Sequence, residues 1–175
     1  MTRIECPAIY FLHGTGGSPN GSVMLLEAEL IRCGQAQYYV RPLLPHADPN
    51  VQPSKSVEYL RTFGIPEGAL LVGISLGGLV AAMLQEQVRS DLHVICISSP
   101  TYAGDTELQQ HMARRVALYS SADPVIARRT ERWPLLAEAY DLPWLRGHDI
   151  DPHKAILANL ICCYMEAGCL NWENR

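Results

Sequence analysis

The fold of this chain is decided by the stretch Ala-Leu-Leu-Val-Gly-Ile-Ser-Leu-Gly-Gly-Leu-Val-Ala-Ala, which occupies residues 69–82. Its short apolar start is typical of a buried parallel strand, and the Ala- and Leu-rich run that continues to about Arg89 is typical of a covering helix. Ser75 lies at the joint, with a glycine two residues away on either side. Such glycines allow a tight turn that holds a serine in a strained conformation with its hydroxyl exposed. The Gly-x-Ser-x-Gly pattern between strand and helix therefore predicts a nucleophile elbow.

Strand and helix signals alternate on both sides of this stretch. The predicted strands cover residues 8–12, 37–44, 93–97, 115–120 and, in a segment that could also be the end of a helix, 136–142. The predicted helices lie between Ser22 and Gly34 and over residues 54–63, 76–89, about 126–133 and 152–167. This alternation predicts an α/β fold: a mostly parallel sheet of about six strands with helices on both faces.

Serine and glycine mark the ends of the first two predicted helices. Ser22 is expected to cap the first helix, and either Ser54 or Ser56 the second. Gly34 and Gly64 are expected to end them, because glycine readily adopts the left-handed conformation that follows many helices.

Length and composition limit the class of protein. At 175 residues the chain is most simply one domain, over residues 1–175, with a sizeable core. Hydrophobic residues at 48% and a formal net charge of −4 are typical of a soluble globular protein, and no basic cluster indicates nucleic-acid binding. No apolar run is long enough to span a membrane, and the N-terminus lacks a signal-peptide core, so a cytoplasmic location is expected.

The cysteines give no sign of a metal site or a disulfide framework. They show neither Cys-x-x-Cys spacing nor pairing with histidine at zinc-ligand intervals. Reduced thiols that mostly pack as small hydrophobic residues are therefore expected at all six positions: Cys6, Cys33, Cys96, Cys162, Cys163 and Cys169.

Polar residues follow several predicted strands at the point where each strand ends. His13, Ser75 and Asp123 each come after the carboxyl end of a strand, and His148 follows the ambiguous last one. Because the carboxyl ends of parallel strands lie at one edge of a sheet, these side chains are expected to converge there.

These residue types suit nucleophilic catalysis. A serine hydroxyl needs a base to take its proton, and a histidine base needs a carboxylate to fix its tautomer. The chain order Ser75, Asp123, His148 is the order expected of such a triad in this kind of sheet. His153 is an alternative base, and Asp48 and Asp105 are alternative acids.

Backbone N–H groups are expected to bind the negative charge that develops on an attacked carbonyl oxygen. One donor should be the amide of Leu76, directly after the serine and at a helix N-terminus. The second should come from the His-Gly-Thr-Gly-Gly loop after the first strand, and we expect it to be the amide of Thr15. His13, Gly14 and Gly16 are expected to support this loop, with the His13 side chain as a structural hydrogen-bonding group.

With these motifs the chain resembles a small, single-domain member of the α/β-hydrolase superfamily, similar to compact bacterial esterases and minimal lipases. The resemblance covers nearly the whole length, through the His-Gly-x-Gly-Gly loop, the Gly-x-Ser-x-Gly-Gly elbow, an aspartate after a late strand, and Gly-His before the last helix. It implies that Ser75 is the nucleophile, Asp123 the acid and His148 the base, with Thr15 and Leu76 as the oxyanion donors. It implies no cofactor and no metal.

Two features depart from the pattern of that superfamily. Only about seven residues precede the first strand, so the antiparallel hairpin usually found there is expected to be absent. Residues 101–113 are too few for the helical lid that many members carry, so an open cleft is expected. Such a cleft suits a small acyl ester or thioester substrate; the sequence does not indicate an oligomeric state.

Three functions remain open at this stage. The leading prediction is a serine hydrolase that cleaves a carboxylic ester or thioester through an acyl-enzyme intermediate. The alternatives are a non-catalytic binding module of the same fold, and a lyase or cofactor-free peroxidase. Of the remaining residues, His46, His93 and His111 are expected at surface or packing positions, and Trp144 is a candidate to line the pocket beside His148.

Overall fold

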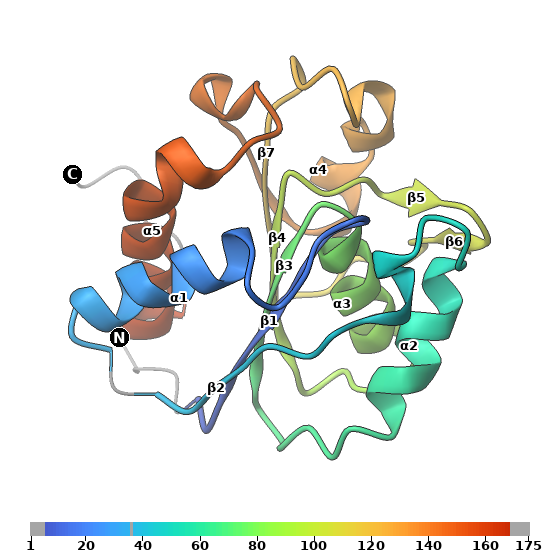
Figure 1. Cartoon of the computed structure of the whole chain (residues 1–175). Coiled ribbons are helices and arrows are strands. Elements are labelled where there is room, and N and C mark those ends of the chain that lie inside the picture. The colour runs from blue at the N-terminus through green and yellow to red at the C-terminus, as the bar shows by residue number, and fades with distance from the viewer. Residues whose placement is uncertain (1–5, 36, 169–175) are drawn as a thin grey trace.

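One parallel sheet forms the centre of the computed structural model of this protein, which describes residues 6–35 and 37–168 (Figure 1). Its strands are β1 Ile9–Leu12, β2 Tyr39–Val40, β3 Leu70–Ile74, β4 His93–Ile97, β7 Arg115–Tyr119 and β8 Glu138–Asp141. The strands lie in the order β2-β1-β3-β4-β7-β8, and every neighbouring pair is parallel. The predicted six-stranded sheet is confirmed, and the ambiguous segment 136–142 contains a strand.

Helices cover both faces of this sheet, as predicted. They are α1 Ser22–Arg32, α2 Pro53–Arg61, α3 Leu76–Gln87, α4 Trp133–Leu136 and α5 Lys154–Ala167. The chain also forms short 3-10 segments: η1 Pro45–Ala47, η2 Ala127–Thr130, η3 Pro143–Leu145 and η4 Asp151–His153. In Figure 1, α1 and α5 lie together on one side of the sheet, and α2, α3 and α4 lie on the other.

The central strands are largely apolar because both of their faces are covered, although β4 begins with His93 and β7 with Arg115. In β1, Ile9 and Phe11 join the core under α1 and α5, whereas Tyr10 and Leu12 join the core under α2 and α3. All four side chains are at most 5% exposed. The two-residue alternation of a strand thus supplies two separate cores from one short sequence.

Three predicted elements are shorter than expected. The strand expected over residues 37–44 pairs with β1 only at Tyr39 and Val40, and it is followed by Pro42, which has no N–H to donate to a sheet. The helix expected over residues 126–133 is wrong: a 3-10 segment comes first, and α4 begins only at Trp133 with a proline in its first turn. The first turn of the last predicted helix is also 3-10.

The predicted serine caps are wrong, whereas the glycine stops are confirmed. The N-cap of α1 is Gly21 and that of α2 is Gln52, and neither makes a side-chain capping bond. Gly34 and Gly64 have φ of 83° and 64°, and Gly168 ends α5 with φ 71°.

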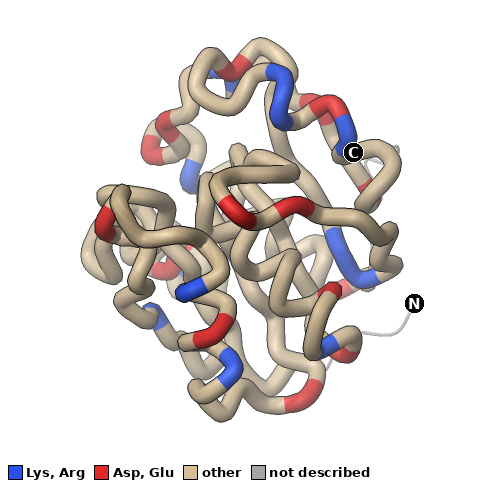
Figure 2. Tube along the Cα trace, turned by 90° about the vertical axis from the view of Figure 1, so that its right-hand side faces the viewer, with Lys and Arg blue, Asp and Glu red and all other residues tan. Residues whose placement is uncertain are grey.

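The segment after β4 carries a small antiparallel hairpin, formed by β5 Tyr102–Ala103 and β6 Thr106–Glu107, and no helix. In the part of the chain that the structure describes, no strand precedes β1, and no helix is long and apolar enough to cross a membrane. Figure 2 shows basic and acidic residues interspersed along the trace.

The five cysteines within the described residues are free thiols. Cys6, Cys96 and Cys162 are buried, as expected of packing residues, and burial raises the pKa of Cys96 to about 12. Cys33 is exposed and does not pack in the core, and Cys169 lies outside the described residues.

Candidate active site

Ser75 occupies the joint between β3 and α3 in a strained backbone conformation. Its φ is 53° and its ψ is −125°, in a region that side-chain-bearing residues rarely adopt. The turn is held by a hydrogen bond of 2.8 Å from the Ser75 amide to the carbonyl of Ile97, the last residue of β4. Strand β4 therefore fixes the direction in which the serine leaves the sheet.

The glycines around Ser75 are required by close packing as well as by the turn. A Cβ atom on Gly73 would lie 2.4 Å from the backbone of Gly78, and one on Gly77 would lie 2.2 Å from the carbonyl oxygen of Leu12. Since real Cβ atoms essentially never approach so closely, α3 can lie against β1 and β3 only with glycine at these positions.

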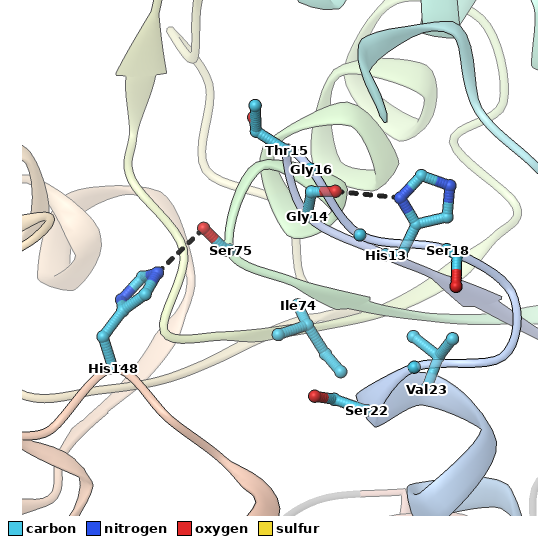
Figure 3. A pocket seen from close by; sticks show the side chains of 12 residues that line it. His13, Gly14, Thr15, Gly16, Ser18, Ser22, Val23, Ile74, Ser75 and His148 are labelled. Atoms are coloured by element: carbon cyan, nitrogen blue, oxygen red, sulfur yellow. Dashed lines mark hydrogen bonds between the residues drawn. The ribbon is translucent and has the colours of Figure 1, made fainter. Parts of the chain in front are cut away.

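A continuous hydrogen-bond chain joins Ser75, His148 and Asp123. The Nε2 atom of His148 lies 3.1 Å from Ser75 Oγ, and Nδ1 lies 2.7 Å from Asp123 Oδ2. Figure 3 shows the imidazole directed at the serine across the cleft. The carboxylate accepts from Nδ1, so the neutral ring carries its proton there and Nε2 is left to accept from the serine hydroxyl.

The carboxylate of this hydrogen-bond chain is shielded from water, whereas the imidazole is accessible. Asp123 is fully buried, and its Oδ1 accepts a hydrogen bond of 2.8 Å from the amide of Val125. The side chain of His148 is 20% exposed, and its backbone φ is 59°. The three residues that the sequence analysis placed at one edge of the sheet thus lie together.

The alternative residues lie elsewhere. The ring of His153 packs against Trp144 at a centroid distance of 5.1 Å, and Trp144 is not among the residues that line the cleft, contrary to expectation. Asp48 and Asp105 are exposed, and their carboxylates accept hydrogen bonds from Asn50 and Ser54.

Both candidate oxyanion donors border Ser75. Leu76 is the first residue of α3, and Thr15 lines the cleft above the serine (Figure 3). No described residue accepts a hydrogen bond from the main-chain N–H of either. Glycine at position 14 allows the loop after β1 to lie this close to Ser75, because a Cβ atom on Gly14 would lie 3.0 Å from Ser75 Cβ.

The cleft has a volume of about 330 Å³ and lies between the loop after β1, the start of α1, and the Ser75–His148 pair. Small residues and hydroxyls form most of its wall: Gly14, Thr15, Gly16, Gly17, Ser18, Gly21 and Ser22. Val23 and Ile74 supply its aliphatic side chains. Among residues 6–35 and 37–168, no group of three or more His, Cys, Asp or Glu side chains could hold a metal ion.

One buried polar group next to this site was not predicted from the sequence. His46 was expected at a surface or packing position; it is a fully buried packing residue, and the hydrogen bonds that it makes to the loop after β1 and to Ser56 were not predicted. Its position two residues after the predicted strand 37–44, at the same edge of the sheet, was the available signal.

The structure has the α/β-hydrolase fold. No protein-family model matches the sequence, and no curated protein matches it. Solved structures of that fold do match, among them an alpha/beta hydrolase enzyme from the metagenome of lagoon sediments at Mar Chica, Morocco, with a TM-score of 0.68 and 16% identity over 93% of this chain and 91% of the other.

Two further solved structures are similar. A candidate hydrolase of the alpha/beta superfamily from Xanthomonas campestris has a TM-score of 0.64 and 16% identity over 87% of this chain and 94% of its own. The ydeN gene product from B. subtilis has a TM-score of 0.64 and 15% identity over 90% of this chain and 97% of its own. At such identities the likeness establishes the fold alone.

Proposed function

We propose that this protein is a serine hydrolase that cleaves a carboxylic ester or thioester through an acyl-enzyme intermediate. The observation that carries the proposal is the hydrogen-bond chain from Ser75 through His148 to the buried Asp123, at the edge of an open cleft. The description of structures with this fold as hydrolases supports it. No cofactor is needed for this chemistry.

In the first half-reaction, Ser75 Oγ attacks the substrate carbonyl while its proton passes to Nε2 of His148. The carboxylate of Asp123 stabilises the imidazolium that forms, without itself taking the proton. The tetrahedral intermediate then collapses, the bond to the alcohol or thiol breaks, and the leaving group takes the proton from His148. In the second half-reaction, His148 activates a water molecule that releases the acid and restores the serine.

The amides of Thr15 and Leu76 would stabilise the oxyanion of both tetrahedral intermediates. Such donors act on charge that develops only in the transition state, so they raise the rate more than they tighten substrate binding. Loss of one donor in a serine hydrolase typically raises the barrier by about 2.7–4 kcal/mol. Since the donating groups are backbone, the side chains of Thr15 and Leu76 are free to vary.

The proposal is tested by labelling with a fluorophosphonate probe followed by peptide mapping. The wild-type protein should be labelled on Ser75, and Ser75→Ala should lose labelling and esterase activity. Ser22→Ala is the matched control, because this serine lines the same cleft outside the hydrogen-bond chain. A well-folded wild-type protein that does not label would favour the non-catalytic binding module.

The assignment of the base is tested by comparing His148→Ala with His153→Ala in short-chain ester hydrolysis. Removal of a triad member typically lowers kcat by a factor of about 10⁴ or more, and we expect this of His148→Ala. His153→Ala should keep nearly full activity, since its ring packs against Trp144. The reverse result would make His153 the base.

A further inference from the structure

The loop that carries Thr15 is anchored to the segment before α2 on both sides of that residue. The amide of Leu44 donates to Nε2 of His13 at 3.0 Å, and Nε2 of His46 donates to the carbonyl of His13 at 2.8 Å. Beyond Thr15, the amide of Gly16 donates to the carbonyl of Ala47 at 3.0 Å. Three hydrogen bonds thus fix a stretch of four residues next to Ser75.

The ring of His13 also fixes the peptide plane that contains the Thr15 amide. Because Nε2 accepts from Leu44, the proton of the neutral ring is on Nδ1, which donates to the carbonyl of Gly14 at 2.9 Å. That carbonyl and the Thr15 N–H belong to one trans peptide, so they point in opposite directions. Figure 3 shows the Gly14 carbonyl directed toward His13 and away from Ser75.

His46 holds this arrangement from beneath and is itself fixed by α2. Its ring is fully buried, and Nδ1 lies 2.8 Å from the hydroxyl of Ser56, which also accepts from the His46 amide at 3.1 Å. The proton that Nε2 donates to the His13 carbonyl leaves Nδ1 to accept from the Ser56 hydroxyl. Every polar atom of the ring therefore has a partner.

The ring of His46 is also neutral over the range in which an esterase would work. Burial lowers the pKa of His46 to about 4, and it outweighs the hydrogen bond to the His13 carbonyl, which acts in the opposite direction. A neutral ring keeps a single proton on Nε2, aimed at the His13 carbonyl.

We propose that His46, held by Ser56, is a positioning residue that keeps the main-chain N–H of Thr15 in the orientation required to bind the oxyanion. This inference rests on the proposed function. His46 does not line the cleft, so it acts through His13 and the loop and not by contact with substrate.

The decisive variants are His46→Phe and His46→Gln. Phenylalanine keeps the volume of the ring but leaves the His13 carbonyl without its donor, whereas the glutamine amide can still donate to it. Since an oxyanion donor acts in the transition state, His46→Phe should lower kcat for p-nitrophenyl acetate by about 10- to 100-fold, with KM within about threefold of wild type. His46→Gln should recover a large part of that loss.

His93→Phe is the matched control. It also removes a histidine-to-hydroxyl hydrogen bond, between Nδ1 and Tyr164 at 2.9 Å, but at the opposite end of a strand from the cleft. It should lower the melting temperature and leave kcat unchanged. A folded His46→Phe with kcat within about twofold of wild type, or a glutamine variant no better than phenylalanine, would overturn the inference.

Two additions keep the inference testable whatever the activity. If His46→Phe does not fold, Ser56→Ala and His46→Leu take its place, since leucine also removes the donor, and an unchanged kcat in both overturns the inference. If the wild-type protein neither labels nor hydrolyses esters, the proposed function fails by itself. Hydrogen exchange of the amides of residues 14–17 then tests the anchoring alone: it should accelerate in His46→Phe and not in His93→Phe, and equal rates would overturn it.

Discussion

Ser75 has a strained backbone conformation, and the proposed chemistry requires that conformation. A non-glycine residue with a φ of 53° is strained by roughly 1–3 kcal/mol, and the surrounding glycines and the bond to Ile97 hold it there. The proposed role accounts for this strain, because the same conformation places the Ser75 hydroxyl 3.1 Å from Nε2 of His148. The proline-free turn with glycine at fixed offsets is a local pattern, which is why sequence alone predicted it.

The buried His46 makes the stability of the protein depend on pH. Its pKa is about 4 in the folded state and about 6.5 when unfolded, so between these values the unfolded chain binds more protons. Stability should therefore fall as the pH falls from 6.5 to 4, by up to about 3 kcal/mol from this residue. Urea unfolding at pH 7 and at pH 4.5 measures the difference, which should be smaller in His46→Gln.

The control for this prediction is His93→Gln. Burial also lowers the pKa of His93, to a smaller extent, so its removal should reduce the pH dependence less than removal of His46. An equal change in the free energy of unfolding between pH 7 and pH 4.5 for wild type and His46→Gln would contradict the assignment of a lowered pKa to His46.

The sequence predicts Ser75, Asp123 and His148 as site residues but gives no role to His46, for a physical reason. The first three follow strand ends, and their types and order are characteristic of one chemistry. The role of His46 depends on α2 lying over η1, with Ser56 facing inward, and nothing in the local sequence specifies that packing. The expectation that Ser56 caps α2 pointed away from it.

At the scale of elements, the contact of α3 with β1 depends on the absence of a side chain at Gly77. We expect Gly77→Ala to destabilise the protein by about 3 kcal/mol, because its Cβ would lie 2.2 Å from a backbone oxygen that cannot move without shifting β1. Thermal and urea unfolding measure the change. Gly147→Ala is the control, since a Cβ there meets no atom within 4 Å, and equal effects of the two would refute this account.

A buried arginine ties the start of β7 to the end of α3. The guanidinium of Arg115 is fully buried and donates to the carbonyl of Ala82 at 3.0 Å and to the side chain of Gln85 at 2.9 Å, with Glu86 at 3.5 Å. Arg115→Met should cost about 3 kcal/mol, because it removes the cation beside the Glu86 carboxylate and takes buried hydrogen bonds from the Gln85 side chain and the Ala82 carbonyl. The exposed Arg114, changed to Met, should shift the urea midpoint little; a similar shift for both would show that burial is not the cause.

Element boundaries were predicted well where the core dictated them and poorly where it did not. Apolar runs such as Val94–Ile97 read as strands because both faces are buried. The edge strand β2 is half-buried and flanked by proline, so its pairing ends after two residues. The segment from Ala127 to Leu136 divides into η2 and α4, with Pro134 in the first turn of α4, and helical periodicity does not predict this division.

At the scale of the whole molecule, the segment after β4 forms only a short hairpin and leaves the cleft open. The volume of the cleft, about 330 Å³, is small. With a wall of glycines and hydroxyls, the cleft should favour short acyl groups. We expect kcat/KM for p-nitrophenyl esters to fall by at least about tenfold from butyrate to dodecanoate, since the longer chain would leave most of its surface in water. Rates across the ester series measure this, and a preference for dodecanoate would contradict it.

The hairpin of β5 and β6 lies between two groups of site residues along the chain. In the proposed mechanism, the nucleophile Ser75 and both oxyanion donors precede Gly104 at the tip of the hairpin, whereas Asp123 and His148 follow it. A chain severed at this exposed glycine would give two polypeptides, neither holding a complete set of reacting groups. Ester hydrolysis by the mixed fragments would then measure how far they reassemble, and either fragment alone should hydrolyse no ester.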